Sequence, residues 1–180
     1  MASEISSRYG EALFQLAEEN GTVEEMREEA LIVRNALKET PDLLIFFRAV
    51  QIDAQEKKDA IDRMFAGFTK EMRNFLKLLT DKDRTYYLKE ILDTFIDRCN
   101  EVLNIETAVV SSARPLSSED MKRIQAALEK KSGKKVLLTN EVDESLIAGI
   151  KVVTGNTVTD VTTAHRINEL KDLLLRGDKA

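Results

Sequence analysis

The sequence predicts an α+β protein in two parts: an antiparallel bundle of six helices over residues 1–103, and a small α/β domain with a mixed sheet over residues 104–180. Aromatic residues divide the chain, because all seven Phe and all three Tyr lie between Tyr9 and Phe95. Charge divides it at the same place, since the first part has 15 basic and 21 acidic side chains and the second has 12 and 11. The spacing of apolar residues also changes near Asn104, from a helical period to alternation.

Residues 1–103 contain six apolar series with helical spacing, each bounded by residues that start or stop helices. The first helix is expected to stop at Asn20-Gly21, because glycine readily ends a helix. Thr22 and Glu25 form a capping box, in which a hydroxyl and a carboxylate satisfy each other's backbone N–H groups. The expected starts of the second to sixth helices are Thr22, Thr40, Asp53, Thr69 and Asp83. The short connections between these helices predict the antiparallel bundle.

Residues 104–180 alternate β-branched and other side chains in short segments, which is typical of strands. A helix that starts at Ser117 and ends at Gly133 separates the first two strands. The expected strands cover residues 105–111, 135–140, 147–153 and 157–161, with a hairpin turn at Gly155-Asn156. A last helix starts at Thr162 or Thr163. The order β-α-β-β-β-α predicts helices packed against a mixed sheet.

The composition excludes several classes of function. A formal net charge of −5 and a pI of about 5.1 oppose nucleic-acid binding. One cysteine, Cys99, and one histidine, His165, cannot supply a four-ligand zinc site, and the glycines form no phosphate-binding loop. The longest apolar run, residues 43–47, is too short for a membrane span. We therefore expect a soluble protein from a reducing compartment with no metal and no cofactor, in which Cys99 packs in the core and His165 is an ordinary exposed or capping residue.

Two helices of the first part have more apolar surface than a single core contact needs. At about 100° per residue, small and apolar side chains of the first helix cover roughly 200°, about twice the usual width. They are Ile5, Tyr9, Gly10, Ala12, Leu13, Phe14, Leu16 and Ala17. The fifth helix has a second broad arc, formed by Met72, Phe75, Leu76, Leu78 and Leu79. Either neighbouring helices cover these arcs, or a groove between them accepts an amphipathic helix of another protein.

Four motifs resemble those of one family, the delta subunit of F-type ATP synthases and its mitochondrial relative, the oligomycin-sensitivity-conferring protein. Residues 9–17 (YGEALFQLA) are similar to the family's opening helix. Residues 74–79 (NFLKLL), followed by Arg84, resemble its fifth helix and the start of the sixth. Residues 113–117 (ARPLS) and 142–150 (VDESLIAGI), with Asp160 further on, resemble a turn and the C-terminal signature.

The resemblance implies a non-catalytic stator subunit, present once per complex, that links the catalytic head to the peripheral stalk so that rotation drives ATP synthesis coupled to ion transport. It implies that residues 1–103 bind the N-terminal helix of an alpha subunit and that residues 104–180 bind the b subunits of the stalk. The place implied is the cytoplasmic face of the bacterial cell membrane, with membrane association only through the complex. The implied groove residues are Tyr9, Ala12, Leu13, Leu16, Phe75, Leu76 and Leu79, and the implied structural signature residues are Asp143, Leu146, Gly149 and Asp160.

Two other interpretations stay open at this point. One is a generic helical adaptor module fused to a small α/β ligand-binding domain, which would not bind synthase subunits. The other is an enzyme, which requires titratable groups clustered around His165 or Cys99. The resemblance favours the stator subunit over both.

Overall fold

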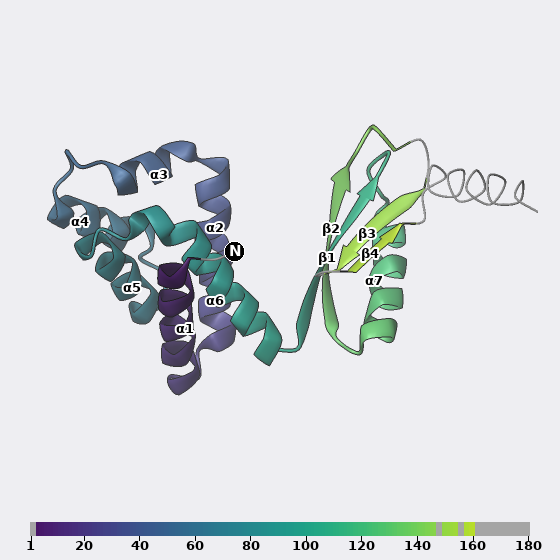
Figure 1. The fold of residues 1–180 in the computed structure, drawn as a ribbon, viewed down its shortest axis with the longest axis horizontal. Helices are drawn as coiled ribbons and strands as arrows, with labels where there is room; N and C mark the ends of the chain where they lie inside the picture. Colours follow the sequence, from purple (N-terminus) through teal and green to yellow (C-terminus); the bar gives the residue numbers. More distant parts are fainter. Residues whose placement is uncertain (1–2, 147–148, 155–156, 161–180) are drawn as a thin grey trace, which may run out of the picture. The chain divides into compact units, whose positions relative to one another are not determined.

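The computed structural model describes residues 3–146, 149–154 and 157–160. Contacts divide the chain into two compact units, Met1–Leu103 and Asn104–Ala180. The first unit is helical and the second contains a sheet (Figure 1). The prediction of an α+β protein with a mixed sheet is confirmed.

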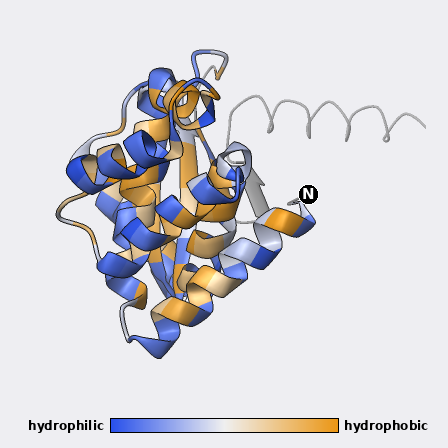
Figure 2. Cartoon of the chain, turned by 90° about the vertical axis from the view of Figure 1, so that its left-hand side faces the viewer, coloured by the Kyte–Doolittle hydropathy of each residue, from blue (hydrophilic) through white to orange (hydrophobic). Residues whose placement is uncertain are grey.

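Residues 3–103, the described part of the first unit, contain six α-helices and one 3-10 turn. They are α1 (Glu4–Glu19), α2 (Val23–Glu39), α3 (Pro41–Arg48), α4 (Ala54–Met64), α5 (Lys70–Asp81), the 3-10 turn Thr85–Tyr87 and α6 (Leu88–Val102). Hydrophobic and hydrophilic segments alternate along the helices, as expected for amphipathic helices (Figure 2). Their buried side chains form one core, in which Leu13, Phe47 and Phe95 are among the largest fully buried residues.

Three of the predicted helix ends in this unit are confirmed. The Asp53 side chain accepts a hydrogen bond from the backbone N–H of Gln55 at 3.2 Å and so caps α4. The Thr69 hydroxyl accepts one from the backbone N–H of Met72 at 3.3 Å and caps α5. Gly21 follows α1 with a φ of 67°, a left-handed conformation that glycine adopts without strain.

The predicted capping box at Thr22 and the predicted helix start at Asp83 are wrong. Thr22 precedes α2, but its hydroxyl donates to the sulfur of Met26 at 3.3 Å and caps no backbone N–H group, so the capping box does not form. Asp83 does not open α6, because the 3-10 turn Thr85–Tyr87 lies between them. Asp83 has a φ of 53°, which is typical of the residue that terminates a helix. It therefore belongs to the end of α5.

The described part of the second unit contains a four-stranded mixed sheet and one helix. The elements are β1 (Ile105–Ser112), α7 (Ser118–Ser132), β2 (Lys135–Val142), β3 (Ile150–Thr154) and β4 (Thr157–Asp160). The strand order is β2-β1-β3-β4, in which β1 is parallel to β2 and the other pairs are antiparallel. The four strands appear where the sequence predicted them, with small shifts at their ends. The predicted turn at Gly155-Asn156 and the predicted last helix from Thr162 or Thr163 lie outside the described residues.

Helix α7 packs against the edge strand β2. Both of its predicted ends are confirmed, because the Ser117 hydroxyl caps its first turn and Gly133 follows it with a φ of 69°. The Gln125 side-chain N–H donates to the backbone O of Val136 at 2.9 Å, and the backbone N–H of Val136 donates to the Glu129 carboxylate at 3.1 Å. Side chains of α7 therefore satisfy both backbone groups of one edge residue.

Gly10 allows α1 to approach α6 closely. It is buried, and a Cβ added to it would lie 2.8 Å from Cβ of Thr94 and 3.1 Å from the backbone O of Ile91. The backbone of α6 cannot move away without disturbing the core that it carries. This close approach fixes the side of α1 that faces the core.

We expect Gly10→Ala to lower the melting temperature of the protein. Overpacking of a tight contact costs about 1–3 kcal/mol, and the better helix propensity of alanine, worth about 1 kcal/mol, offsets only part of this. Thermal unfolding followed by circular dichroism measures the change. The matched control is Gly67→Ala, because a Cβ at Gly67 meets no atom within 4 Å. Equal melting temperatures for the two variants would contradict the close approach.

Candidate functional site

Helices α1 and α5 are neighbours in the first unit and run in opposite directions (Figure 1). Leu16, near the end of α1, lines a hollow together with Lys70 and Asn74 from the first half of α5. Ile5, near the start of α1, lines a second hollow together with Arg84, which follows α5. We call the surface formed by these two hollows the α1–α5 groove.

Tyr9 and Phe75 connect the two hollows. Their ring centroids lie 6.5 Å apart with an angle of 61° between the planes, an edge-on arrangement that aromatic pairs favour. Tyr9 lines the hollow near the start of α1, and Phe75 lines the other. Along α1, Ile5 and Leu16 are about 16 Å apart at 1.5 Å per residue. The α1–α5 groove is therefore long enough for about three turns of another helix.

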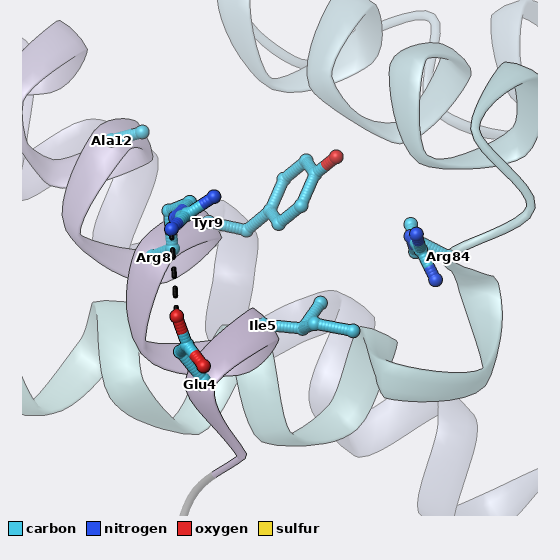
Figure 3. Close-up of a pocket in the computed structure, with 6 residues that line it drawn as sticks. All are labelled: Glu4, Ile5, Arg8, Tyr9, Ala12 and Arg84. Atoms are coloured by element: carbon cyan, nitrogen blue, oxygen red, sulfur yellow. Dashed lines mark ion pairs between the residues drawn. The ribbon is translucent and has the colours of Figure 1, made fainter.

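The hollow near the start of α1 has a volume of about 420 Å³. It is lined by Glu4, Ile5, Arg8, Tyr9, Ala12 and Arg84. Ile5 and Tyr9 project from α1 toward the segment that carries Arg84 (Figure 3). Arg8 instead pairs with Glu4 at 3.5 Å, one turn apart on the same helix. This end of the groove thus combines apolar side chains with charged groups at its rim.

The hollow near the end of α1 has a volume of about 460 Å³. It is lined by Leu16, Asn20, Lys70, Glu71, Asn74, Phe75 and Leu78. Leu16 is 38% exposed and Leu78 is 42% exposed, so two large apolar side chains meet solvent in the same hollow. Large apolar side chains exposed together in one hollow are typical of a protein-binding site.

The predicted groove residues divide into two groups. Tyr9, Ala12, Leu16 and Phe75 line the hollows. Leu13, Leu76 and Leu79 do not, because they lie in the core of the first unit with exposed fractions of 1%, 2% and 0%. These three leucines support the groove from beneath and offer no surface to a partner.

The structure adds Ile5, Leu78 and Arg84 to the groove. Ile5 and Leu78 belong to the two broad apolar arcs, so the width of those arcs was the sequence signal that identified them. Arg84 lies in the connection after α5, and no spacing pattern places it beside α1. Its position depends on where the chain turns after Asp83.

An ion pair links each wall of the groove to a neighbouring helix. On the α1 side, Glu11 pairs with Arg98 of α6 at 2.9 Å, and this hydrogen bond raises the pKa of the guanidinium above its usual value. On the α5 side, Asp62 of α4 pairs with Lys77 at 2.6 Å, and the hydrogen bond from Lys77 lowers the pKa of Asp62. Each pair is partly exposed, so its net contribution to stability is small.

Two of the four signature residues of the second unit, Asp143 and Gly149, shape the backbone. The Asp143 carboxylate accepts hydrogen bonds from the hydroxyl of Ser145 at 2.6 Å and from its backbone N–H at 3.0 Å, and these bonds lower the pKa of Asp143. Gly149 has a φ of 94°, a conformation that favours glycine. Leu146 is half-buried, and Asp160 ends β4 with a side chain outside the described part of the chain.

Other candidate chemistry in the described residues is limited. Among them, no group of three or more His, Cys, Asp or Glu side chains is placed to hold a metal ion. None of the described helices has the length and apolar character needed to cross a membrane. Cys99 is fully buried in the core, as predicted, and burial raises the pKa of its thiol to about 12. His165 lies outside the described residues.

The helical unit with its elongated apolar groove, followed by a compact α/β unit, defines a partner-binding protein. Residues 5–174 match the family model described as ATP synthase delta (OSCP) subunit. The chain is 35% identical to the ATP synthase subunit delta of Alkaliphilus oremlandii over 97% of each chain, and 34% identical to that of Syntrophomonas wolfei over 94% of each chain. It also resembles a chain in a cryo-EM structure of the Toxoplasma gondii mitochondrial ATP synthase hexamer, with a TM-score of 0.74, 25% identity and coverage of 96% of this chain and 98% of that chain.

The chain belongs to the ATP synthase delta (OSCP) subunit family. Members of this family are structural subunits of F-type ATP synthase and are not catalytic, so the resemblance found in the sequence is confirmed. The alternative interpretations, a generic adaptor and an enzyme, are set aside by this membership.

We expect Cys99 to resist thiol reagents in the folded protein. At pH 8 the buried thiol, with its pKa near 12, is both inaccessible and protonated, and only the thiolate reacts. Labelling with a chromogenic disulfide reagent before and after addition of denaturant measures this. Stoichiometric labelling of the native chain at the rate of the denatured chain would contradict the placement of Cys99 in the core.

Proposed function

We propose that this chain is the static link between the catalytic head of an F-type ATP synthase and its peripheral stalk. The observation that carries the proposal is the α1–α5 groove, whose exposed leucines and aromatic pair are suited to an amphipathic helix. Such a link keeps the head from turning with the central shaft, so that rotation drives ATP synthesis coupled to ion transport.

In this proposal the six helices of the first unit act as one antiparallel bundle that binds the N-terminal helix of an alpha subunit. Tyr9, Ala12, Leu16 and Phe75 supply the apolar contacts, together with Leu78. Buried apolar anchors suit a link that carries torque, because exposed ion pairs are weak and become weaker with salt. A partner helix that places one apolar side chain in each hollow is held at two points along its length.

The second unit, in this proposal, binds the b subunits of the peripheral stalk on the cytoplasmic face of the bacterial membrane. One copy per complex holds two different partners, so binding of one partner raises the effective concentration of the other. Asp143, Leu146, Gly149 and Asp160 keep the shape of this unit without touching the partner. Association with the membrane is then indirect, through the assembled complex.

A charge placed in the groove should weaken the contact with the head. Ala12→Asp is expected to raise the dissociation constant for a peptide of about 20 residues from the alpha N-terminus by at least about tenfold, because docking of the peptide takes the added carboxylate out of water. Isothermal titration calorimetry with the full chain measures it. The matched control is Ile32→Asp, since Ile32 is a 54% exposed apolar residue of α2 outside the groove. Equal affinity of both variants, with unchanged helicity, would reject the groove as the site.

Each of the two units should bind a different partner. A chain that ends at Leu103 is expected to retain affinity for the alpha peptide and to lose affinity for the b subunits, because only the first unit carries the groove. Pull-down of purified b subunits by the full and shortened chains, with circular dichroism of both, measures the difference. Retention of b subunits by the shortened chain would overturn the assignment of the second unit.

A further inference from the structure

Glu29 of α2 is a buried carboxylate that none of the preceding contacts explains. It is 6% exposed and lies outside both hollows. Its two oxygens accept hydrogen bonds from a single residue, Thr69: one from the backbone N–H, and one from the hydroxyl at 2.7 Å. A buried carboxylate persists only where its oxygens are satisfied, and here the start of α5 satisfies them.

The contact completes the cap of α5. A hydroxyl has one proton and two lone pairs, so a Thr69 hydroxyl that donates to Glu29 presents a lone pair to the backbone N–H of Met72, at 3.3 Å. Glu29 therefore orients the capping hydroxyl and also binds a backbone N–H at the positive end of the helix dipole. Two helices that are far apart in sequence are joined at this one residue.

The start of α5 is also a wall of the α1–α5 groove. Lys70 and Glu71, which directly follow Thr69, line the hollow near the end of α1, as does Asn74 one turn later. Helix α5 packs most extensively on α4 and has few contacts with α1 and α2. The hydrogen bonds to Glu29 therefore act together with the burial of Met72 to restrain how far the first turn of α5 lies from α1.

We infer that Glu29 is a positioning residue for partner binding: through Thr69 it holds the first turn of α5 at the distance from α1 that the docked helix requires. The inference rests on the proposed function, because it names what sets the width of the proposed groove. Without the Glu29 contact the first turn of α5 frays, and a partner helix must order this turn when it binds. The free energy of that ordering is subtracted from the binding free energy, so the partner binds more weakly.

The test compares the affinity of the alpha N-terminal peptide for full chains with altered Glu29. Glu29→Ala removes both acceptors and is expected to raise the dissociation constant about five- to tenfold, the effect of losing one good helix cap. Glu29→Gln keeps one acceptor oxygen and is expected to restore much of the affinity. Thr69→Val removes the hydroxyl and is expected to resemble Glu29→Ala, whereas Thr69→Ser should bind as the unchanged chain does.

A matched control separates positioning from general loss of stability. Lys57 of α4 is buried to a similar degree, its ammonium donates to the backbone O of Phe47 at 3.0 Å, and it lines neither hollow. Lys57→Met should lower the melting temperature and leave peptide affinity unchanged. Amide hydrogen exchange should show lost protection at residues 70–74 in Glu29→Ala and retained protection there in Lys57→Met.

The outcomes distinguish this inference from the proposed function. If the unchanged chain binds no peptide, the proposed function fails. If it binds, and Glu29→Ala or Thr69→Val binds equally well, or Lys57→Met weakens binding as much as they do, the positioning role of Glu29 is overturned. If Glu29→Ala does not fold, the comparison of Glu29→Gln and Thr69→Val with Thr69→Ser decides in the same way.

Discussion

The close contact between Gly10 of α1 and Thr94 of α6 is the constraint on which the rest of the first unit depends. Helix α1 has apolar side chains around more than half of its circumference, so several rotations of the helix could bury a comparable area. Only the rotation that turns Gly10 to α6 allows the two backbones to approach. Leu13 and Ala17 are then buried, and Tyr9, Ala12 and Leu16 are left facing α5.

The sequence predicted that α1 and α5 have surplus apolar surface, but it could not divide each arc between core and groove. At about 100° per residue, Phe75 lies about 100° around α5 from Leu76, and Leu78 lies about 160° from it. The core takes Leu76 and its neighbours, and the groove takes the far edge of the arc. That division depends on the packing of other helices against α5, which the spacing within one helix does not contain.

Local signals predicted helix ends well where the hydroxyl before the helix kept a lone pair directed at the first turn. Thr69 and Ser117 cap as expected. Thr22 does not, because its backbone (φ −110°, ψ 21°) lacks the extended conformation of a capping residue, and its hydroxyl is directed at the sulfur of Met26. Asp83 ends one helix instead of starting the next. The contact of Glu29 with Thr69 joins residues 40 positions apart, so no local pattern could reveal it. The predicted elements in the second unit followed from alternation and turn residues, whereas strand order followed only from the structure.

The edge strand β2 affects whether the chain can aggregate before it joins a complex. An exposed edge strand is a template on which a second strand can add, and this is a common route to aggregation. At Val136 both backbone groups are already bound by Gln125 and Glu129, so an incoming strand finds no hydrogen-bonding partner at that residue. In a newly synthesised copy that has not yet joined a complex, side chains of α7 thus block the addition of a second strand at Val136.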